Sequence, residues 1–251
     1  EIVDFYHAEF VQNWERIGIS WDRYTSTGTV NHASVTQDIF LCLLEKGHID
    51  RRVSEQYYDD VAGRFLPDRY IEGTCPHCEY NEARGDQCEQ CGRTLDPEEL
   101  IDPRSKITGS EPVVRETEHF YLRLSDFEDS LREWLDSRQG WRSHVLNFSK
   151  GWLDEGLQDR AITRDLDWGI EVPVQDFGSD KRIYVWFEAV IGYLSAAKEW
   201  ASDQEDSNIW KDWWENPDAR SVYFIGKDNI PFHTIIWPAM LQGYGGLNLP
   251  T

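Results

Sequence analysis

The chain has 251 residues, with 46 acidic and 25 basic side chains and a formal net charge of −21 at pH 7. This length is enough for one or two domains with a buried core. Aromatic residues make up 14% of the chain, which excludes a disordered acidic tail, because disordered segments are poor in aromatic residues. A folded protein with this acidic excess indicates a salt-rich cytoplasm, such as that of a halophilic archaeon. There, molar salt shortens the Debye length to about 3 Å.

No targeting or membrane segment is expected. The first residues include Glu1, Asp4 and Glu9 and lack the apolar run of a signal peptide. No apolar stretch is long enough to cross a bilayer. Four of the five cysteines fall in one short segment, which suits a reducing compartment. We therefore expect a cytoplasmic protein with no membrane partner, and the sequence leaves its oligomeric state open.

The N-terminal part is predicted to be helical. Residues 1–17 repeat apolar side chains at helical spacing, from Tyr6 to Ile17. Residues 34–46 predict a second helix, which Gly47 ends. The chain opens inside a helical pattern and without methionine, so we expect it to be the middle of a longer protein.

The segment from position 75 to position 91 contains two C-x₂-C pairs separated by nine residues. Two residues between thiolates let both sulfurs face one point, and two such knuckles supply four soft ligands for tetrahedral Zn²⁺. The predicted ligands are Cys75, Cys78, Cys88 and Cys91. These four fill the coordination sphere, so one structural zinc per chain is expected rather than four unrelated thiols. His77, inside the first knuckle, is expected to be exposed and not a ligand.

After the cysteines, the chain returns to regular patterns. HFYLRL (119–124) predicts a strand. Ser125 and Glu128 form a capping-box pattern that predicts the start of a helix. A second helix is expected to follow and to end at Gly156.

The last third of the chain alternates predicted strands and helices. KRIYVWF (181–187) predicts a strand that leads into a helix over residues 188–200. SVYFI (221–225) predicts a second apolar strand, followed by a helix that Pro231 opens. Apolar strands that alternate with helices indicate a parallel sheet covered by helices. Ligands of such sheets lie beyond the carboxyl ends of the strands, so a site is expected there.

Four segments of the chain together resemble a known family. They are FLPDRYIEGTCPHC (65–78), TEHF (117–120), YVWFEAVIGY (184–193) and FIGKDNIPFH (224–233). They are similar to segments of methionyl-tRNA synthetases, which are class I aminoacyl-tRNA synthetases, and the resemblance covers essentially the whole chain. It implies an α/β fold in which a Rossmann-type parallel-sheet catalytic domain, incomplete in this chain, carries an inserted zinc-knuckle connective domain.

The resemblance also implies the domain boundaries. Residues 1–47 would be the helical part of the first half of the catalytic domain. Residues 48–163 would be the zinc-binding connective insertion, and residues 164–251 the second half of the catalytic domain. The changes of pattern at Ile49 and Ala161 lie close to these boundaries.

The function that the resemblance implies is that of a methionine–tRNA ligase. Such an enzyme uses ATP and magnesium to activate methionine as methionyl-adenylate and then transfers methionine to the 3′ end of tRNA(Met). Class I enzymes stabilise the reacting phosphates with a HIGH-like and a KMSKS-like motif, and neither occurs in this chain. Because this chemistry depends on placed charges, the chain alone is expected to be inactive. The rival hypothesis is a zinc-ribbon nucleic-acid or protein interaction module without catalysis, which has no use for GKDNIPFH.

Site residues are carried over position by position. Those that resemble a methionine pocket are Trp186, Ala189, Tyr193, Phe232 and His233. A thioether is polarizable and contacts aromatic edges favourably, by about 0.3–1.5 kcal/mol each. Gly226 and Asp228 match positions that contact the ATP-derived part of the adenylate, and Arg164 matches a catalytic arginine near the reaction centre.

Without the resemblance, the same residues have ordinary structural interpretations. The aromatic run 184–187 is typical of a core strand, His233 of a packed histidine, and Asp228 of a helix N-cap. Several arginines either face tRNA or are scattered solvated charges; they are Arg51, Arg52, Arg64, Arg69, Arg104 and Arg115.

Two positions depart from the family pattern. Glu188 begins Glu-Ala-Val where the family commonly has Asp-Ala-Pro. Ser105 and Thr108 stand where many archaeal relatives carry a further cysteine pair. One zinc is therefore expected, not two.

Overall fold

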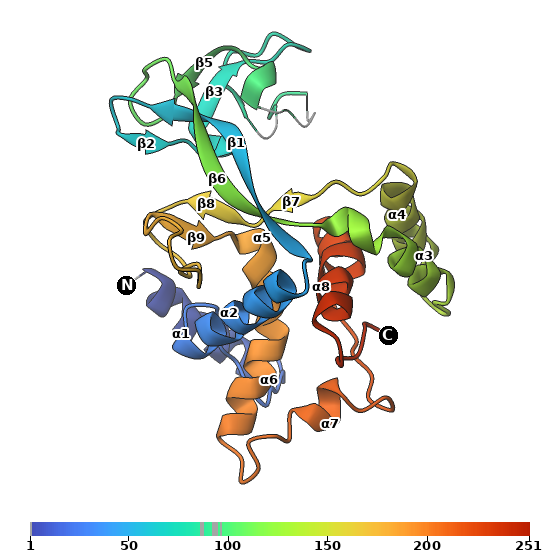
Figure 1. Cartoon of the computed structure of the whole chain (residues 1–251). Helices are drawn as coiled ribbons and strands as arrows, with labels where there is room; N and C mark the ends of the chain where they lie inside the picture. The colour runs from blue at the N-terminus through green and yellow to red at the C-terminus, as the bar shows by residue number, and fades with distance from the viewer. Residues whose placement is uncertain (1, 86–87, 92–94, 96) are drawn as a thin grey trace.

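A helical body carries a β-rich lobe at one end in the computed structural model (Figure 1). The structure describes residues 2–85, 88–91, 95 and 97–251. The α-helices are α1 (Ile2–Arg16), α2 (Val30–Glu45), α3 (Glu128–Asp136), α4 (Ser143–Asp154), α5 (Val185–Glu188), α6 (Gly192–Ser202), α7 (Lys211–Trp214) and α8 (Trp237–Tyr244). The strands are β1 (Ile49–Asp59), β2 (Arg64–Phe65), β3 (Ile71–Thr74), β4 (Ala83–Arg84), β5 (Ile101–Ser105), β6 (Val113–Leu122), β7 (Arg160–Ala161), β8 (Thr163–Asp165) and β9 (Lys181–Ile183).

The strands form three sheets with the orders β2-β1-β6-β7, β4-β3-β5 and β8-β9. Strands β1 and β6 pair over nearly their whole length, from Ile49 opposite Leu122 to Tyr58 opposite Val113, and run from the body into the lobe (Figure 1). We use "β-lobe" for the described residues of 49–122 and "body" for the rest. The strand predicted at 119–124 is confirmed as the end of β6.

Every strand pair that the structure describes is antiparallel, so the predicted parallel sheet is not seen. The strand predicted at 181–187 ends at Ile183, and α5 begins at Val185. Segment 221–225 forms no strand, and Phe224 is 96% exposed. A strand needs a neighbour for its backbone hydrogen bonds, and no described strand pairs with this segment.

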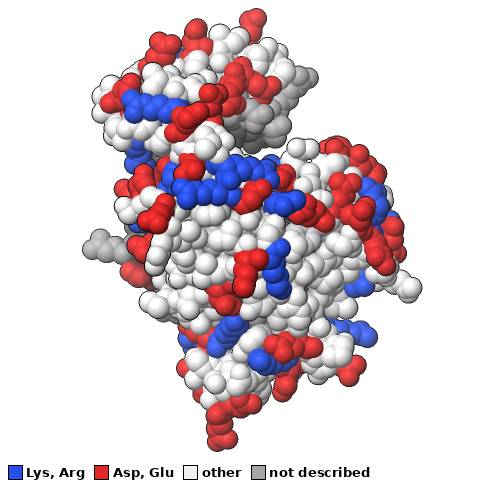
Figure 2. Space-filling model, in the orientation of Figure 1, with Lys and Arg blue, Asp and Glu red and all other residues white. Residues whose placement is uncertain are grey.

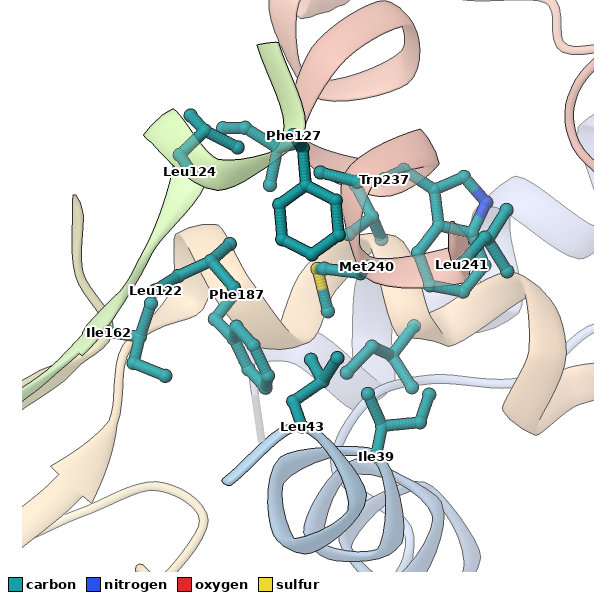
Figure 3. Packing of buried hydrophobic residues seen from close by; sticks show 14 of the residues in the cluster. Ile39, Leu43, Leu122, Leu124, Phe127, Ile162, Phe187, Trp237, Met240 and Leu241 are labelled. Carbon is teal, nitrogen blue, oxygen red and sulfur yellow. The ribbon is translucent and has the colours of Figure 1, made fainter. Parts of the chain in front are cut away.

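The main core lies where α2, β6, α5 and α8 meet (Figure 3). Phe40 of α2 packs edge-on against Phe120 and Phe187, with ring centroids 5.2 and 6.1 Å apart. Trp237 and Met240 of α8 are fully buried beside them. Each buried side chain of this size contributes roughly 1.5–3 kcal/mol, so this core holds the body together.

Two helix starts show how local polar groups set element boundaries. Helix α2 begins at Val30, earlier than predicted, because the Thr29 side chain accepts the backbone N–H of His32. The capping box predicted at Ser125 and Glu128 is wrong. Ser125 donates to Asp159 at 2.7 Å, and Glu128 accepts the N–H of residue 157 at 3.3 Å, so neither caps the helix.

The other predicted helices are present. Helix α1 covers most of 1–17, α4 precedes Gly156, and the helical turns after Pro231 lead into α8. None of the described helices is long and apolar enough to cross a membrane.

Candidate functional site

The four predicted cysteine ligands converge in the β-lobe. Their sulfur atoms all lie within 4.8 Å of one another. The Cys75–Cys91 and Cys78–Cys88 sulfur distances are 3.9 and 3.5 Å. A tetrahedral zinc with bonds near 2.3 Å needs sulfur–sulfur distances of about 3.8 Å. The four thiols therefore fit a metal ion such as zinc.

The chain around the first knuckle is shaped for this arrangement. Cys75 follows β3 directly, and its N–H donates to the carbonyl of Tyr80 at 2.8 Å. Glu79 takes φ of 60°, a left-handed turn that favours glycine and that the sequence does not signal. The N–H of His77 points at the Cys75 sulfur at 3.4 Å, while the His77 side chain is exposed outside the thiol cluster, as predicted.

Electrostatics also favour a thiolate in the second knuckle. Backbone N–H groups of Cys91 and Gln90 donate to the sulfur of Cys88 and lower the pKa of that thiol to about 7. A thiolate is the form that binds metals. The fold thus favours the thiolate at Cys88, whereas burial and the neighbouring thiols raise the pKa of Cys78 despite the backbone N–H of Tyr80.

A second polar cluster lies in the same lobe, around the buried Asp59. Thr108 and Ser110 donate hydroxyl hydrogen bonds to its carboxylate at 2.6 and 3.1 Å. The N–H groups of Val61 and Ala62 donate at 2.9 Å each. Burial opposes ionisation, yet these donors and the Ser105 hydroxyl hold the pKa of Asp59 well below its usual range. Ser105 and Thr108, noted as departures, therefore serve a hydrogen-bonded cluster.

In the body, a small cavity of about 280 Å³ brings together the residues that resemble a methionine pocket. It is lined by Trp186, Ala189, Val190, Tyr193, Phe224, Ile225, Gly226, Asn229, Phe232 and His233. All five residues carried over as a methionine pocket are among them. Their convergence is a finding, while their role remains a prediction.

Aromatic side chains form the walls of this cavity and pack against one another. Trp186 and Phe232 stack face to face, with centroids 4.3 Å apart and planes at 10°. His233 Nδ1 lies 2.8 Å from the carbonyl oxygen of Asn229, and its Nε2 lies 2.8 Å from the Tyr193 hydroxyl.

These two contacts fix which nitrogen of His233 carries the hydrogen and in which direction the His233–Tyr193 hydrogen bond runs. A carbonyl only accepts, so Nδ1 of His233 carries the hydrogen. Burial lowers the pKa of His233, so the ring is neutral at pH 7 and its Nε2 accepts the Tyr193 O–H. Burial also raises the pKa of Tyr193, which keeps that proton on the hydroxyl.

The backbone that carries Phe232 and His233 is a π-helical turn, η6 (Phe232–Ile236), just before α8. Such turns are rare and occur frequently at functional sites. Here the turn places Phe232 and His233 on the same cavity wall.

A larger cavity of about 1600 Å³ adjoins the first, and Trp186 and Phe232 line both. Four arginines line it: Arg64, Arg69, Arg160 and Arg164. Aromatic side chains lie among them: Tyr70, Trp152, Trp168 and Tyr184. Figure 2 shows Lys and Arg gathered in a band where the β-lobe meets the body, whereas Asp and Glu dominate the far ends of that face.

The predicted catalytic and adenylate residues are dispersed around these cavities. The Arg164 guanidinium lies 4.1 Å over the Tyr184 ring and donates to two backbone carbonyls, so its orientation is fixed. Gly226 lines the small cavity. Asp228 is exposed in the turn η5 (Lys227–Asn229) and lines neither cavity.

Only part of the predicted arginine patch forms. Arg64 and Arg69 line the large cavity, and Arg104 lines neither cavity. Arg51 and Arg52 pair with acidic residues of the β-sheet, and Arg115 pairs with Asp60 in the turn after β1. Sequence reasoning missed Arg160. No local signal marks it, because its place in the cavity depends on the pairing of β7 with β6.

A family model described as tRNA synthetases class I (M) matches residues 1–251. A methionine–tRNA ligase of Dehalococcoides mccartyi is 57% identical over 250 residues, which cover 100% of this chain and 45% of the relative. One from Thermoplasma acidophilum is 50% identical over 250 residues, covering 100% and 46%. The chain thus spans less than half the length of these relatives, which include bacterial and archaeal proteins.

Solved structures give the same fold. The crystal structure of Mycobacterium tuberculosis methionyl-tRNA synthetase bound by methionyl-adenylate aligns with a TM-score of 0.63 at 24% identity. The alignment covers 96% of this chain and 41% of that one. At this identity, the match establishes the fold alone.

Proposed function

Because the chain belongs to the class I methionyl-tRNA synthetase family, we propose that it is the central part of a methionine–tRNA ligase. The complete protein joins methionine to ATP as methionyl-adenylate, with magnesium, and then esterifies the 3′ end of tRNA(Met). The observation that carries the proposal is the small cavity, which collects an aromatic stack and a neutral His–Tyr pair. The complete protein is proposed to work in the cytoplasm, where translation takes place.

The cavity suits a thioether side chain. Trp186 and Phe232 offer a polarizable wall, and sulfur–aromatic contacts are favourable. The Tyr193 hydrogen is committed to His233, whose own hydrogen is committed to a carbonyl. A hydrogen-bond acceptor in place of the methionine sulfur would therefore find no free donor in this His–Tyr pair, and an unpaired buried polar group costs roughly 1–3 kcal/mol. This is how the pocket selects methionine.

The adenylate is proposed to lie at the mouth of the same cavity. A side-chain carbon added at Gly226 would meet nothing closer than the amide of Asn229 at 3.7 Å. The protein's own packing therefore does not require glycine there, which supports a close approach of ligand to the backbone. Asp228 is exposed beside it and can accept the hydroxyl protons of a ribose.

The large cavity is the proposed entrance for the 3′ end of tRNA(Met). Arginines neutralise phosphates, and aromatic faces stack with unpaired bases. The cavity offers both, with its four arginines set among five acidic residues: Asp68, Asp159, Asp167, Glu171 and Glu188. Arg164, fixed over Tyr184 and facing this cavity, is the proposed catalytic arginine.

The domain arrangement follows the same proposal. Residues 1–47 and 164–251 belong to the catalytic domain and 48–163 to the connective insertion, whose four cysteines hold one structural zinc. Segment 221–225 pairs as an inner strand of a Rossmann-type parallel sheet in the full-length protein. Its apolar side chains on both faces support this, because inner parallel strands are buried on both sides.

The test is methionine-dependent ATP–pyrophosphate exchange with a full-length protein that contains this chain. Exchange that requires methionine is expected, and Trp186→Ala and His233→Ala should lower kcat/KM for methionine by about 10-fold or more. The 251-residue chain alone should show none. If the full-length protein binds zinc but neither binds methionine nor catalyses exchange, a zinc-ribbon interaction module becomes the better description.

A further inference from the structure

His32 is buried between three helices, and each of its ring nitrogens contacts a polar group from a different helix. It lies in the first turn of α2 and is 1% exposed. Its Nδ1 lies 2.8 Å from the hydroxyl of Ser195 on α6, and its Nε2 lies 2.6 Å from a carboxylate oxygen of Glu188 on α5. These partners are 163 and 156 residues away along the chain.

The contacts fix which atom donates. A carboxylate only accepts, so Nε2 of His32 carries a hydrogen and donates it to Glu188. The Ser195 hydroxyl lies 3.1 Å from the carbonyl of Gly192 and can donate either there or to Nδ1. Under both arrangements the ring holds the Glu188 carboxylate through Nε2–H.

The two partners of His32 lie on the two helices that carry pocket walls. Glu188 ends α5, on which Trp186 stacks against Phe232. Ser195 lies two residues after Tyr193 on α6. The side chain of Asn31, next to His32, donates to the Ser195 carbonyl at 2.8 Å and ties α2 to α6 a second time.

We propose that His32 is a positioning residue of the methionine pocket, which fixes the spacing between Trp186 on α5 and Tyr193 on α6. This inference rests on the proposed function. Without the Nε2–H donor, the largely buried Glu188 carboxylate lacks its partner and turns toward the large cavity that it lines. The last turn of α5 then moves with it. A misplacement of about 1 Å in such a site costs up to roughly 100-fold.

A matched control lies elsewhere in the chain. His119 is equally buried, with Nε2 3.0 Å from Asp165 and Nδ1 3.0 Å from the Thr163 hydroxyl. It joins β6 to the β8–β9 hairpin and lines neither cavity. Loss of a buried histidine–carboxylate pair therefore affects stability in both variants, but only His32 bears on the pocket.

The experiment measures methionine-dependent exchange in the full-length protein and its variants, with melting temperatures alongside. His32→Leu should raise KM for methionine by about 10-fold or more and KM for ATP by less than about twofold. His32→Gln, whose amide can still donate to Glu188, should recover most of the loss. His119→Leu should lower the melting temperature while KM for methionine stays within about twofold.

An unchanged KM for methionine in folded His32→Leu would overturn the inference. So would a rise in KM for methionine that is as large in His119→Leu as in His32→Leu, or a KM for ATP that rises as much as KM for methionine in His32→Leu. If His32→Leu does not fold, Ser195→Ala decides, because it removes one hydroxyl: KM for methionine should rise about threefold, and no rise overturns the inference. Exchange by the unsubstituted protein is a separate result. Its absence would overturn the proposed function and the premise of this inference together, whereas exchange with silent variants overturns the inference alone.

Discussion

The β-lobe and the body are held together by different means. The body buries a continuous apolar core around α2, α5 and α8, into which the ends of β1 and β6 insert Ile49, Phe120 and Leu122. The apolar cluster of the β-lobe is small, and two of its members, Cys75 and Cys88, belong to the thiol cluster that could hold a metal. A short segment with so few apolar side chains cannot offset the entropy of folding by burial alone. The lobe therefore depends on local bonds, and the body on the hydrophobic effect.

Removal of the metal is the largest test of this contrast. A strong chelator should release one zinc per chain and leave the described residues of 70–105 without a fixed structure, because ligand binding and folding of such a segment are one process. The helical circular dichroism of the body should remain. Hydrogen exchange read along the chain would show both effects.

Cys42 offers the control for the metal site, since it lies on α2, outside the thiol cluster. Cys42→Ser should leave the metal content unchanged, while Cys78→Ser should lower it. Purified protein with two metals or none, or a body that melts together with the lobe, would contradict the contrast.

A substitution that leaves a cavity in the main core should destabilise the body, whereas metal removal should loosen the lobe. Leu43 is fully buried in the body and Ile71 in the lobe. Leu43→Ala should cost about 2–5 kcal/mol of unfolding free energy and lower the helical melting transition. Ile71→Ala should increase hydrogen exchange in the lobe and leave that transition in place. Equal shifts of the helical transition in both variants would mean that lobe and body unfold as one unit.

Salt separates the two regions in another way. The net charge of −21 is screened at molar KCl but much less at about 0.1 M, where the Debye length is about 10 Å. The melting temperature of the body should rise by several degrees between these conditions. Zinc–thiolate bonds are short and direct, so zinc release should change less. Sucrose is the control, because it favours burial without screening charge. A melting temperature that does not rise in KCl would remove the halophile interpretation.

The sequence predicted elements where local pattern decides. Residues 1–17 repeat at helical spacing and form α1, and the C-x₂-C spacing marked all four thiols that converge. Residues 221–225 have strand composition but form no strand, since a strand also needs a partner. Composition alone does not supply that partner.

The site followed the same rule. The pocket residues converge because they lie on two short segments, 186–193 and 232–233, which the resemblance marked. The contact of His32 with Glu188 spans 156 residues, and no periodicity signals such a pair. Ser105 and Thr108 were noted only as missing ligands, and their bonds to Asp59 required the fold of the lobe.

Asp59 provides the smallest and most specific test, because it stabilises the lobe without metal. Its pKa is depressed in the folded state by the hydroxyl and N–H donors around it. The ionised form therefore stabilises the lobe fully above the unfolded value of about 3.9, and this contribution is lost as the pH falls below that value toward the folded pKa. Asp59→Asn should lower lobe stability near pH 6, measured by hydrogen exchange, and the difference from the unsubstituted protein should vanish on acidification. Asp60→Asn is the matched control, since Asp60 is exposed and pairs with Arg115 at the surface, where such pairs contribute about 0–1 kcal/mol. A difference between Asp59→Asn and the unsubstituted protein that stayed constant down to about pH 2 would show that shape, not charge, makes Asp59 important.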